Sequence, residues 1–200
     1  GRIFEDPALA SDARPVQGGK YINSPQTVLY DKSRYLYGIN KAKNEIRQQK
    51  NAVIVEGNLD LILSHQAGVI NTVAVSGTAL TELHVGLLRR IADSVTFAFD
   101  VDSAGIAASR RAAELAFAKD FHVKIVDIEG GKDPADIVQK NPERWREMVG
   151  SSIDSIAFFL KKSSGGAPPA DSFAKKKIGE EILPMIGKLG NEIERAHWIG

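Results

Sequence analysis

Two aspartates separated by a single residue follow an apolar run in the middle of the chain. Asp100 and Asp102 come directly after residues 95–99. Residues two apart in an extended chain point to the same side, so both carboxylates can approach one point above a sheet. Like charges held close together destabilise a fold unless a cation lies between them. The pair therefore predicts a site for a hard divalent cation, whereas either aspartate alone could be a helix cap or a turn residue.

Three more acidic residues follow other apolar runs. Glu56 ends the first run, Asp60 lies one helical turn later, and Asp133 follows the fourth run. In open α/β sheets, ligands gather at the carboxyl ends of the strands, where these side chains would meet. Mg²⁺, or Mn²⁺ in its place, takes oxygen ligands shared between carboxylates and phosphate. We therefore expect Glu56, Asp100 and Asp102 to form a catalytic metal site with Asp60 beside them, while Asp133 could either join the site or cap a helix.

The elements that must position these acids alternate along the chain. Continuous apolar runs occur at residues 52–57, 72–77, 94–99 and 122–128, and helical patterns separate them. Such runs are typical of parallel strands covered on both faces. Strand and helix alternation predicts βαβ units. The expected fold class is α/β, a mostly parallel sheet flanked by helices.

Charge divides the chain into three parts. Residues 1–50 carry nine basic and five acidic residues, residues 51–150 carry ten and fourteen, and residues 151–200 carry seven and six. We expect a mixed N-terminal segment, a metal-binding domain and a helical subdomain over these ranges. A basic flank beside an acidic centre suits a metal enzyme that binds a polyanion, although random surface variation would give the same pattern.

Composition excludes several classes of protein. Of the 200 residues, 43% are hydrophobic and 26% charged, as in an ordinary globular chain, and none is cysteine. The sequence therefore has neither disulfides nor a cysteine-ligated zinc site, and its four histidines share no ligand spacing. No apolar run approaches the roughly 20 residues of a membrane span, and the N-terminus does not resemble a signal peptide. We expect a cytoplasmic protein without membrane partners.

Three motifs together resemble a known fold. "VEGNLD", "SGTALT" and "FAFDVDSAG" resemble the Toprim fold, which primases, topoisomerases and some nucleases share. Two flanking segments are more specific. "KYINSPQTVLYDKSRYLYGINKAK" is similar to the segment that precedes Toprim in bacterial DnaG-type primases, and "GGKDPADIV" is similar to their motif after the fourth strand.

The resemblance implies a DNA-dependent RNA polymerase that makes short RNA primers on single-stranded DNA from nucleoside triphosphates, by two-metal-assisted nucleotidyl transfer. It implies that Glu56, Asp100 and Asp102 are the metal ligands, with Asp60 beside them. Four further residues match family positions near the nucleotide and primer: Arg2, Lys20, Asn23 and Lys32. The lysines could equally be solvated surface charges. Val101 departs from the glycine common between the two aspartates and could narrow the space near the metals.

DnaG-type primases also have a zinc-binding domain and a domain that binds the replicative helicase. The resemblance implies that both lie outside this chain, so zinc is expected only in the full-length protein. Residues 1–50 would be the remainder of a basic subdomain, 51–150 the Toprim domain and 151–200 part of a helical subdomain. This core is expected to be monomeric and, in the bacterial cell, associated with the replisome at the nucleoid.

Three other classes of protein fit part of the pattern. Another Toprim enzyme, a nuclease or topoisomerase, would use the same metals to cleave DNA. A haloacid-dehalogenase-like phosphatase would use Asp100 as its nucleophile, but that family places its paired aspartates on the first strand. A non-catalytic Toprim module would keep the fold without the reaction, and loss of an acidic residue would favour it; all of them are present here.

Overall fold

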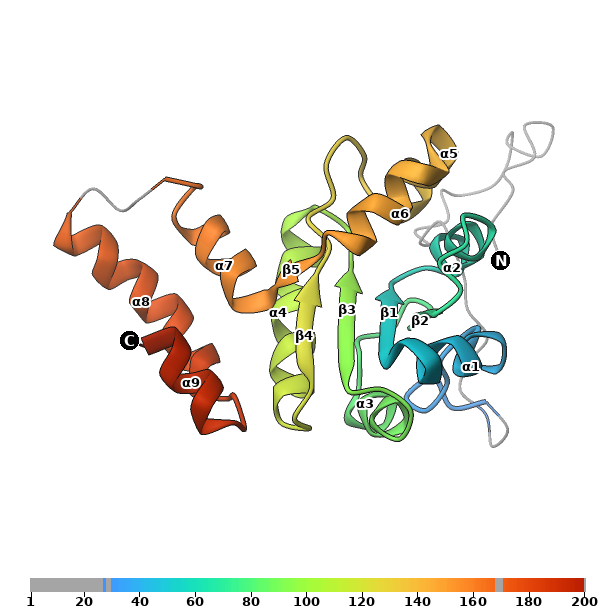
Figure 1. Cartoon of the computed structure of the whole chain (residues 1–200), viewed down its shortest axis with the longest axis horizontal. Helices are drawn as coiled ribbons and strands as arrows, with labels where there is room; N and C mark the ends of the chain where they lie inside the picture. The colour runs from blue at the N-terminus through green and yellow to red at the C-terminus, as the bar shows by residue number, and fades with distance from the viewer. Residues whose placement is uncertain (1–26, 28–29, 168–170, 200) are drawn as a thin grey trace, which may run out of the picture. The chain divides into compact units, whose positions relative to one another are not determined.

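The computed structural model describes residues 27, 30–167 and 171–199 (Figure 1). The chain divides into two compact units, residues 1–31 and 32–200. All helices and strands named below belong to the second unit. The boundaries at 50 and 150 expected from the sequence stay predictions.

A five-stranded sheet forms the centre of the second unit, with the order β2-β1-β3-β4-β5. Its strands are β1 (Asn51–Val55), β2 (Thr72–Ala74), β3 (Ser94–Ala98), β4 (His122–Ile125) and β5 (Ile153–Asp154). The first four pair in parallel, whereas β5 runs antiparallel to β4. The predicted α/β class and mostly parallel sheet are therefore confirmed. The short fifth strand was not predicted.

Helices connect the strands and continue beyond them. They are α1 (Ile39–Gln49), α2 (Asn58–Gln66), α3 (Glu82–Arg89), α4 (Ser103–Phe117), α5 (Pro134–Lys140), α6 (Pro142–Gly150), α7 (Ser155–Ser163), α8 (Ser172–Ile186) and α9 (Glu192–Ile199). Pro134 and Pro142 each occupy the first turn of a helix, where a missing N–H costs no hydrogen bond.

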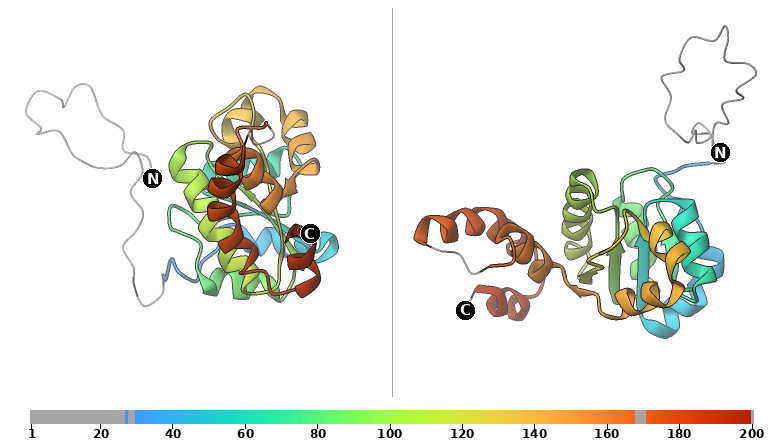
Figure 2. Two further views of the ribbon diagram at one scale, coloured as in Figure 1. Left: turned by 90° about the vertical axis from the view of Figure 1, so that its left-hand side faces the viewer. Right: turned by 90° about the horizontal axis from the view of Figure 1, so that it is seen from above.

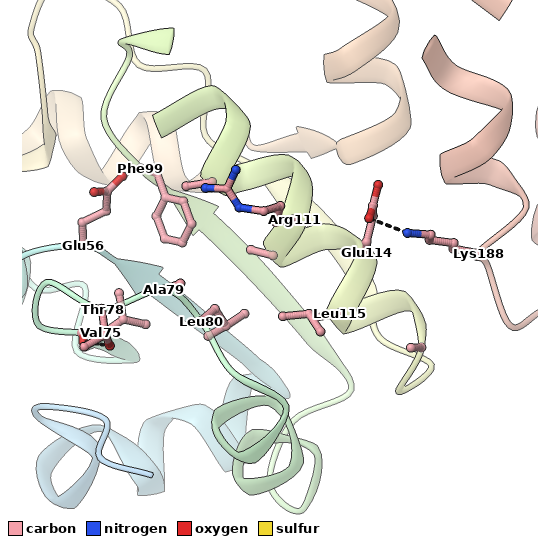
Figure 3. Close-up of a pocket in the computed structure, with 13 residues that line it drawn as sticks. Glu56, Val75, Thr78, Ala79, Leu80, Phe99, Arg111, Glu114, Leu115 and Lys188 are labelled. Atoms are coloured by element: carbon pink, nitrogen blue, oxygen red, sulfur yellow. Dashed lines mark hydrogen bonds and ion pairs between the residues drawn. The ribbon is translucent and has the colours of Figure 1, made fainter. Parts of the chain in front are cut away.

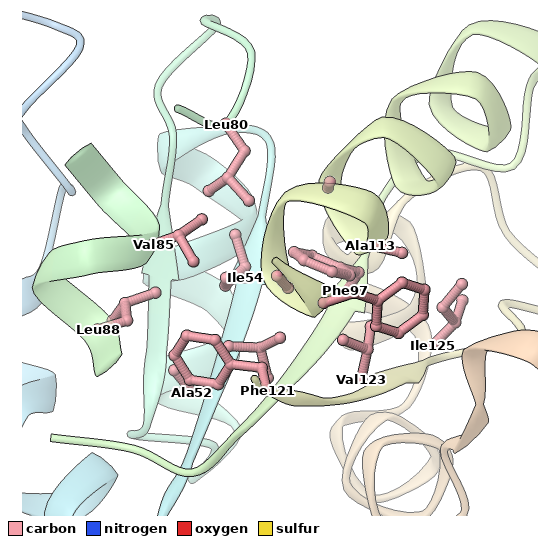
Figure 4. Close-up of a cluster of buried hydrophobic side chains, with 14 of the residues drawn as sticks. Ala52, Ile54, Leu80, Val85, Leu88, Phe97, Ala113, Phe121, Val123 and Ile125 are labelled. Atoms are coloured by element: carbon pink, nitrogen blue, oxygen red, sulfur yellow. The ribbon is translucent and has the colours of Figure 1, made fainter. Parts of the chain in front are cut away.

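Side chains alternate between the two faces of the sheet and build two apolar clusters. On β1, Ala52 and Ile54 pack in a cluster with residues of α1, α3, α4, α7 and α8 (Figure 4). Val53 and Val55 belong to a second cluster with residues of α2, α5 and α6. Figure 2 shows α4 and the α5–α6 pair on opposite sides of the sheet. Both faces are covered, which explains why the strands are apolar throughout.

One helix face differs from the sequence prediction. The period of residues 80–91 predicts that Leu83 points inward, but its side chain is 50% exposed. His84 is fully buried instead, because both of its ring nitrogens are satisfied. Its Nε2–H donates to the carbonyl oxygen of Lys32 at 2.9 Å, and its Nδ1 accepts from the N–H of Thr81 at 3.3 Å.

Over the described ranges, none of the helices combines the length and the apolar character that a membrane-spanning segment requires.

Candidate metal centre

The first two acids follow neighbouring strands at one edge of the sheet. Glu56 follows β1 directly, and Asp100 lies two residues beyond β3. Because Val55 is paired in register with Ala98, both acids emerge at the same edge of the sheet, with Asp100 one residue further along. The backbone N–H of Asp100 donates to Oε1 of Glu56 at 3.3 Å, which links the two strand ends directly.

Burial and neighbouring acids raise the pKa of Glu56 and of Asp100. Burial raises the pKa of Asp100 most, and repulsion from Glu56, Asp60, Asp133 and Asp102 brings it to about 7. Burial also raises the pKa of Glu56; repulsion from Asp102 adds to this effect, and the hydrogen bond from the Asp100 N–H opposes it. Among the described residues, every charge that shifts the pKa of Asp100 is therefore negative. The sheet edge gathers acids without supplying Asp100 with a cation from the described residues.

Asp60 holds two segments of the chain together. Its Oδ2 accepts from the N–H of Gly57 at 3.0 Å and its Oδ1 from the N–H of Ala135 at 3.1 Å. The side chain thereby joins the start of α2 to the start of α5. Burial, followed by repulsion from Asp133, raises the pKa of Asp60 to about 6, although both hydrogen bonds oppose the rise. Asp60 thus fixes the position of the loop that carries Asp133.

Asp102 and Asp133 are both helix caps. Oδ1 of Asp102 accepts from the N–H of Gly105 at 2.7 Å, at the start of α4. Oδ1 of Asp133 accepts from the N–H of Asp136 at 2.8 Å, at the start of α5. The capping alternative considered for each residue is therefore confirmed. Capping uses one carboxylate oxygen in each case, so the second oxygen remains chemically able to bind a cation.

The backbone around Asp100 is tightly constrained. A Cβ on Gly105 would lie 2.1 Å from the carbonyl oxygen of Asp100, so only glycine lets α4 begin so close to this loop. The N–H of Val101 donates to the carbonyl oxygen of Lys132 at 3.1 Å, which ties this loop to the one that follows β4. The Val101 side chain is 43% exposed.

The residues fit a divalent cation by their chemistry. All the candidate ligands are carboxylates, the donors that Mg²⁺ prefers, and the charges that shift the pKa of Asp100 include no positive one from the residues described here. In the described part of the chain, no group of three histidine, cysteine or acidic residues converges closely enough to hold an ion. The assignment of metal ligands stays a prediction for all five acids: Glu56, Asp60, Asp100, Asp102 and Asp133.

The residues predicted to bind nucleotide and primer are only partly described. Arg2, Lys20 and Asn23 lie outside the described residues. Lys32 is half-buried, and its carbonyl oxygen accepts the hydrogen bond from His84. The role of its ammonium group stays a prediction.

Sequence reasoning missed a further carboxylate, which follows β4. Asp127 follows β4, and its oxygens lie 2.8 Å from Nζ of Lys161 and 3.0 Å from Nζ of Lys162. Burial raises its pKa, but the hydrogen bonds from both lysines outweigh burial and lower it below the usual value. Nothing near Asp127 in the sequence indicates these partners, because they belong to α7.

The fold and the acids define a Toprim-like domain, and a family model described as Toprim-like matches residues 53–138. The chain is 37% identical over 182 residues to a DNA primase of Halalkalibacterium halodurans, covering 90% of this chain and 30% of that protein. It is 42% identical over 164 residues to a DNA primase of Campylobacter jejuni, covering 82% of this chain and 27% of that protein. A solved "Structure of the DnaG primase catalytic domain bound to ssDNA" superposes with a TM-score of 0.74 at 27% identity, over 90% of this chain and 59% of that one.

The chain belongs to the DnaG-type bacterial DNA primases and corresponds to part of their Toprim-containing catalytic core. It spans about 30% of the length of the curated relatives named above.

Proposed function

We propose that this chain is the metal-binding part of a DNA primase, an RNA polymerase that makes short RNA primers on single-stranded DNA. One observation carries the proposal: carboxylates from three loops lie near Asp100 at one sheet edge, and within the described part of the chain every charge acting on Asp100 is negative. In a member of the primase family, such a site suits a reaction between a hydroxyl group and a triphosphate.

The acids at the end of β1 and β3 are the proposed holders of Mg²⁺, or of Mn²⁺ in its place. Glu56, Asp100 and Asp102 would bind the cation, and Asp60 and Asp133 would surround it. When bound, a pair of such cations supplies an activated attacking hydroxyl and charge neutralisation for the leaving pyrophosphate. The carboxylates favour this binding because a cation relieves their mutual repulsion.

The remaining contacts position these acids. Asp60 joins the starts of α2 and α5 through the N–H groups of Gly57 and Ala135. The close approach of Gly105 to Asp100 and the cap made by Asp102 fix the start of α4. Catalysis in phosphoryl and nucleotidyl transfer is mainly positioning and charge stabilisation, so a rigid arrangement of this kind suits the reaction.

The partners follow from the same proposal. The template is single-stranded DNA, the ligand bound to the DnaG primase catalytic domain that superposes on this chain. Residues 1–50 carry nine basic and five acidic residues, a surplus that suits the phosphates of template, primer and nucleoside triphosphates. Arg2, Lys20, Asn23 and Lys32 are the proposed contacts on this side. Replicative helicase and structural zinc would be bound by other parts of the full-length protein.

A primer assay on the full-length protein tests the proposal. The protein is incubated with single-stranded DNA, labelled ribonucleoside triphosphates and Mg²⁺, and products are separated by size. Short RNA that requires template and metal is expected. Cleavage of the DNA without RNA synthesis would contradict the proposal and would favour a Toprim nuclease.

A further inference from the structure

His84 is a buried polar side chain that has no part in the acidic site described above. It lies in the first turn of α3 and is fully buried. Its Nε2 lies 2.9 Å from the carbonyl oxygen of Lys32, and its Nδ1 lies 3.3 Å from the backbone nitrogen of Thr81. A carbonyl oxygen only accepts and a backbone N–H only donates, so the ring is neutral with its hydrogen on Nε2. The ring therefore joins the start of α3 to the backbone of Lys32.

Thr81, the N-cap of α3, strengthens the same connection. Its Oγ1 accepts from the N–H of His84 at 3.2 Å, and its hydroxyl group donates to the carbonyl oxygen of Ser33 at 2.6 Å. Two consecutive carbonyl groups, those of Lys32 and Ser33, are thus held at the start of α3. We call these four residues the α3 anchor. All four belong to the unit 32–200.

The residue type at position 84 shows that the anchor is more than a helix cap. In a capping box the third helical residue accepts from the N–H of the N-cap, and this residue is usually Glu or Gln. His84 occupies that position in α3. A glutamate would complete the cap but could not donate to the carbonyl oxygen of Lys32, because an ionised carboxylate only accepts. A neutral histidine does both.

The loop between β2 and α3, residues 75–81, connects the α3 anchor to the acidic edge. Near its start, the N–H of Gly77 donates to the carbonyl oxygen of Glu56 at 3.4 Å. Residues 78–80 line one pocket with Glu56 (Figure 3). The four residues from Gly77 to Thr81 span at most about 14 Å. One short loop thus has the acidic edge at one end and the α3 anchor at the other.

We propose that His84 is a positioning residue of the primase reaction, which holds the backbone of Lys32 so that the lysine ammonium group can reach a phosphate at the acidic edge. The inference rests on the proposed function, which assigns Lys32 to the phosphates of nucleotide or primer. A lysine loses side-chain freedom when it binds a phosphate. Because the anchor already fixes the backbone, only the side chain remains to be ordered. His84 itself touches neither phosphate nor metal in this proposal.

Two substitutions of His84 separate the bond to Lys32 from the helix cap. His84→Asn can still accept from the N–H of Thr81 but is too short to donate to the carbonyl oxygen of Lys32. His84→Gln is long enough for both bonds. In primer synthesis by the full-length protein, His84→Asn should raise the KM for nucleoside triphosphate or for primed template about tenfold, the effect of weakening one charge-assisted contact. The KM that rises identifies which phosphate Lys32 contacts.

A purely structural role would not give the remaining two results. The kcat of His84→Asn should change less than about twofold, because the lost contact is a binding contact, and His84→Gln should restore the KM. In a protein that already carries Lys32→Ala, His84→Asn should raise the KM no further. Additive effects of the two changes, or a KM of His84→Asn equal to that of the parent, would overturn the positioning role.

His65 offers a matched control. Its Nε2 lies 2.9 Å from the carbonyl oxygen of Thr72, so a histidine of α2 also holds a backbone carbonyl, but one that belongs to β2. His65→Asn should leave both KM values unchanged. An equal rise in His65→Asn and His84→Asn would show a general effect of losing such a bond and would overturn the specific role of His84.

Thermal melts show which variants fold. If His84→Asn does not fold, Thr81→Ala and Thr81→Ser decide the result instead. Thr81→Ala removes the bond to Ser33 and should raise the same KM, whereas Thr81→Ser keeps the hydroxyl group and should not. A parental KM in folded Thr81→Ala would then overturn the role of the anchor.

Chemical labelling of Lys32 gives a readout that does not depend on synthesis. Acetic anhydride modifies accessible lysines, and mass spectrometry measures the rate at Lys32 in the full-length protein. ATP with Mg²⁺, or primed template, should slow the labelling in the parent and in His84→Gln, and should slow it less in His84→Asn. Equal protection in all three proteins, or no protection of the parent by either ligand, would overturn the positioning role. The primer assay on the parent decides the proposed function separately.

Discussion

Asp100 and Asp127 follow neighbouring parallel strands at the same edge of the sheet, but their surroundings are opposite. The pKa of Asp100 is raised to about 7 by burial and by four other carboxylates. The pKa of Asp127 is lowered, because Lys161 and Lys162 outweigh the effect of burial. Of the residues that the structure describes, two lysines neutralise Asp127, whereas the charges acting on Asp100 are all negative. We propose that the counter-charge for Asp100 comes from solution.

The largest difference between the two carboxylates should be in catalysis. In the full-length protein, Asp100→Asn or Glu56→Gln should reduce primer synthesis by on the order of 100-fold or more, because each removes charge from the proposed metal site. Asp127→Asn is the matched control and should keep nearly full activity. A folded Asp100→Asn protein with near-normal synthesis would show that Asp100 is wrongly assigned.

Asp60 differs from both, because its carboxylate also has a structural role. Asp60→Ala should lower the free energy of unfolding of this chain by about 2–3 kcal/mol, since the N–H groups of Gly57 and Ala135 lose their acceptor. Asp60→Asn, which keeps one oxygen, should lose less. Urea denaturation of the metal-free variants measures both effects. Equal stability of all three proteins would exclude the proposed link between α2 and α5.

The stability of the metal-free chain should depend on the ionisation of Asp100. Its pKa is raised from 3.8 to about 7 on folding, so its contribution to stability is fully present below pH 4 and is lost as the pH rises to about 7. Asp100→Asn should therefore unfold with a free energy about 1–2 kcal/mol higher than the parent at pH 8, after allowance for solvent screening. The difference should vanish near pH 4. Denaturation in chelator at both pH values checks the sign, and a variant less stable at pH 8 would contradict it.

The contribution of Asp127 to stability should depend on pH in the opposite direction and by a smaller amount. Its folded pKa is lowered, so its contribution is present above the ordinary pKa of 3.8 and is lost as the pH falls through the lower, folded value. Asp127→Asn should reduce the free energy of unfolding by less than about 1 kcal/mol at pH 7, because both lysines are exposed. High salt should weaken the effect, and a loss that is independent of salt would point to packing instead of charge.

The sequence predicted those elements whose pattern lies within a few consecutive residues. Continuous apolar runs between helical patterns predicted β1 to β4, because burial on both faces imposes that composition. The two-residue strand β5, Ile153–Asp154, is too short to show any period. His84 was not expected in the core, since its burial depends on the carbonyl oxygen of Lys32, far away in the chain.

In the acidic site, too, the features set by nearby residues were predicted and those set by distant residues were not. Strand ends and a one-turn spacing brought Glu56, Asp60 and Asp100 together in the prediction, and their mutual effects on pKa agree with that proximity. The bond from Ala135 to Asp60 spans 75 residues and could not be anticipated. The same is true of the lysines that neutralise Asp127, because only the packing of α7 brings them to the end of β4.

We propose that a divalent cation supplies the counter-charge at Asp100. Thermal unfolding of this chain near pH 7.5, with chelator and with millimolar Mg²⁺, tests it most directly. A cation that binds only the folded state should raise the melting temperature of the parent and of Asp127→Asn by about 2–4 °C. Asp100→Asn and Glu56→Gln should show no such rise. An unchanged melting temperature in the parent, or an equal rise in all four proteins, would contradict the claim.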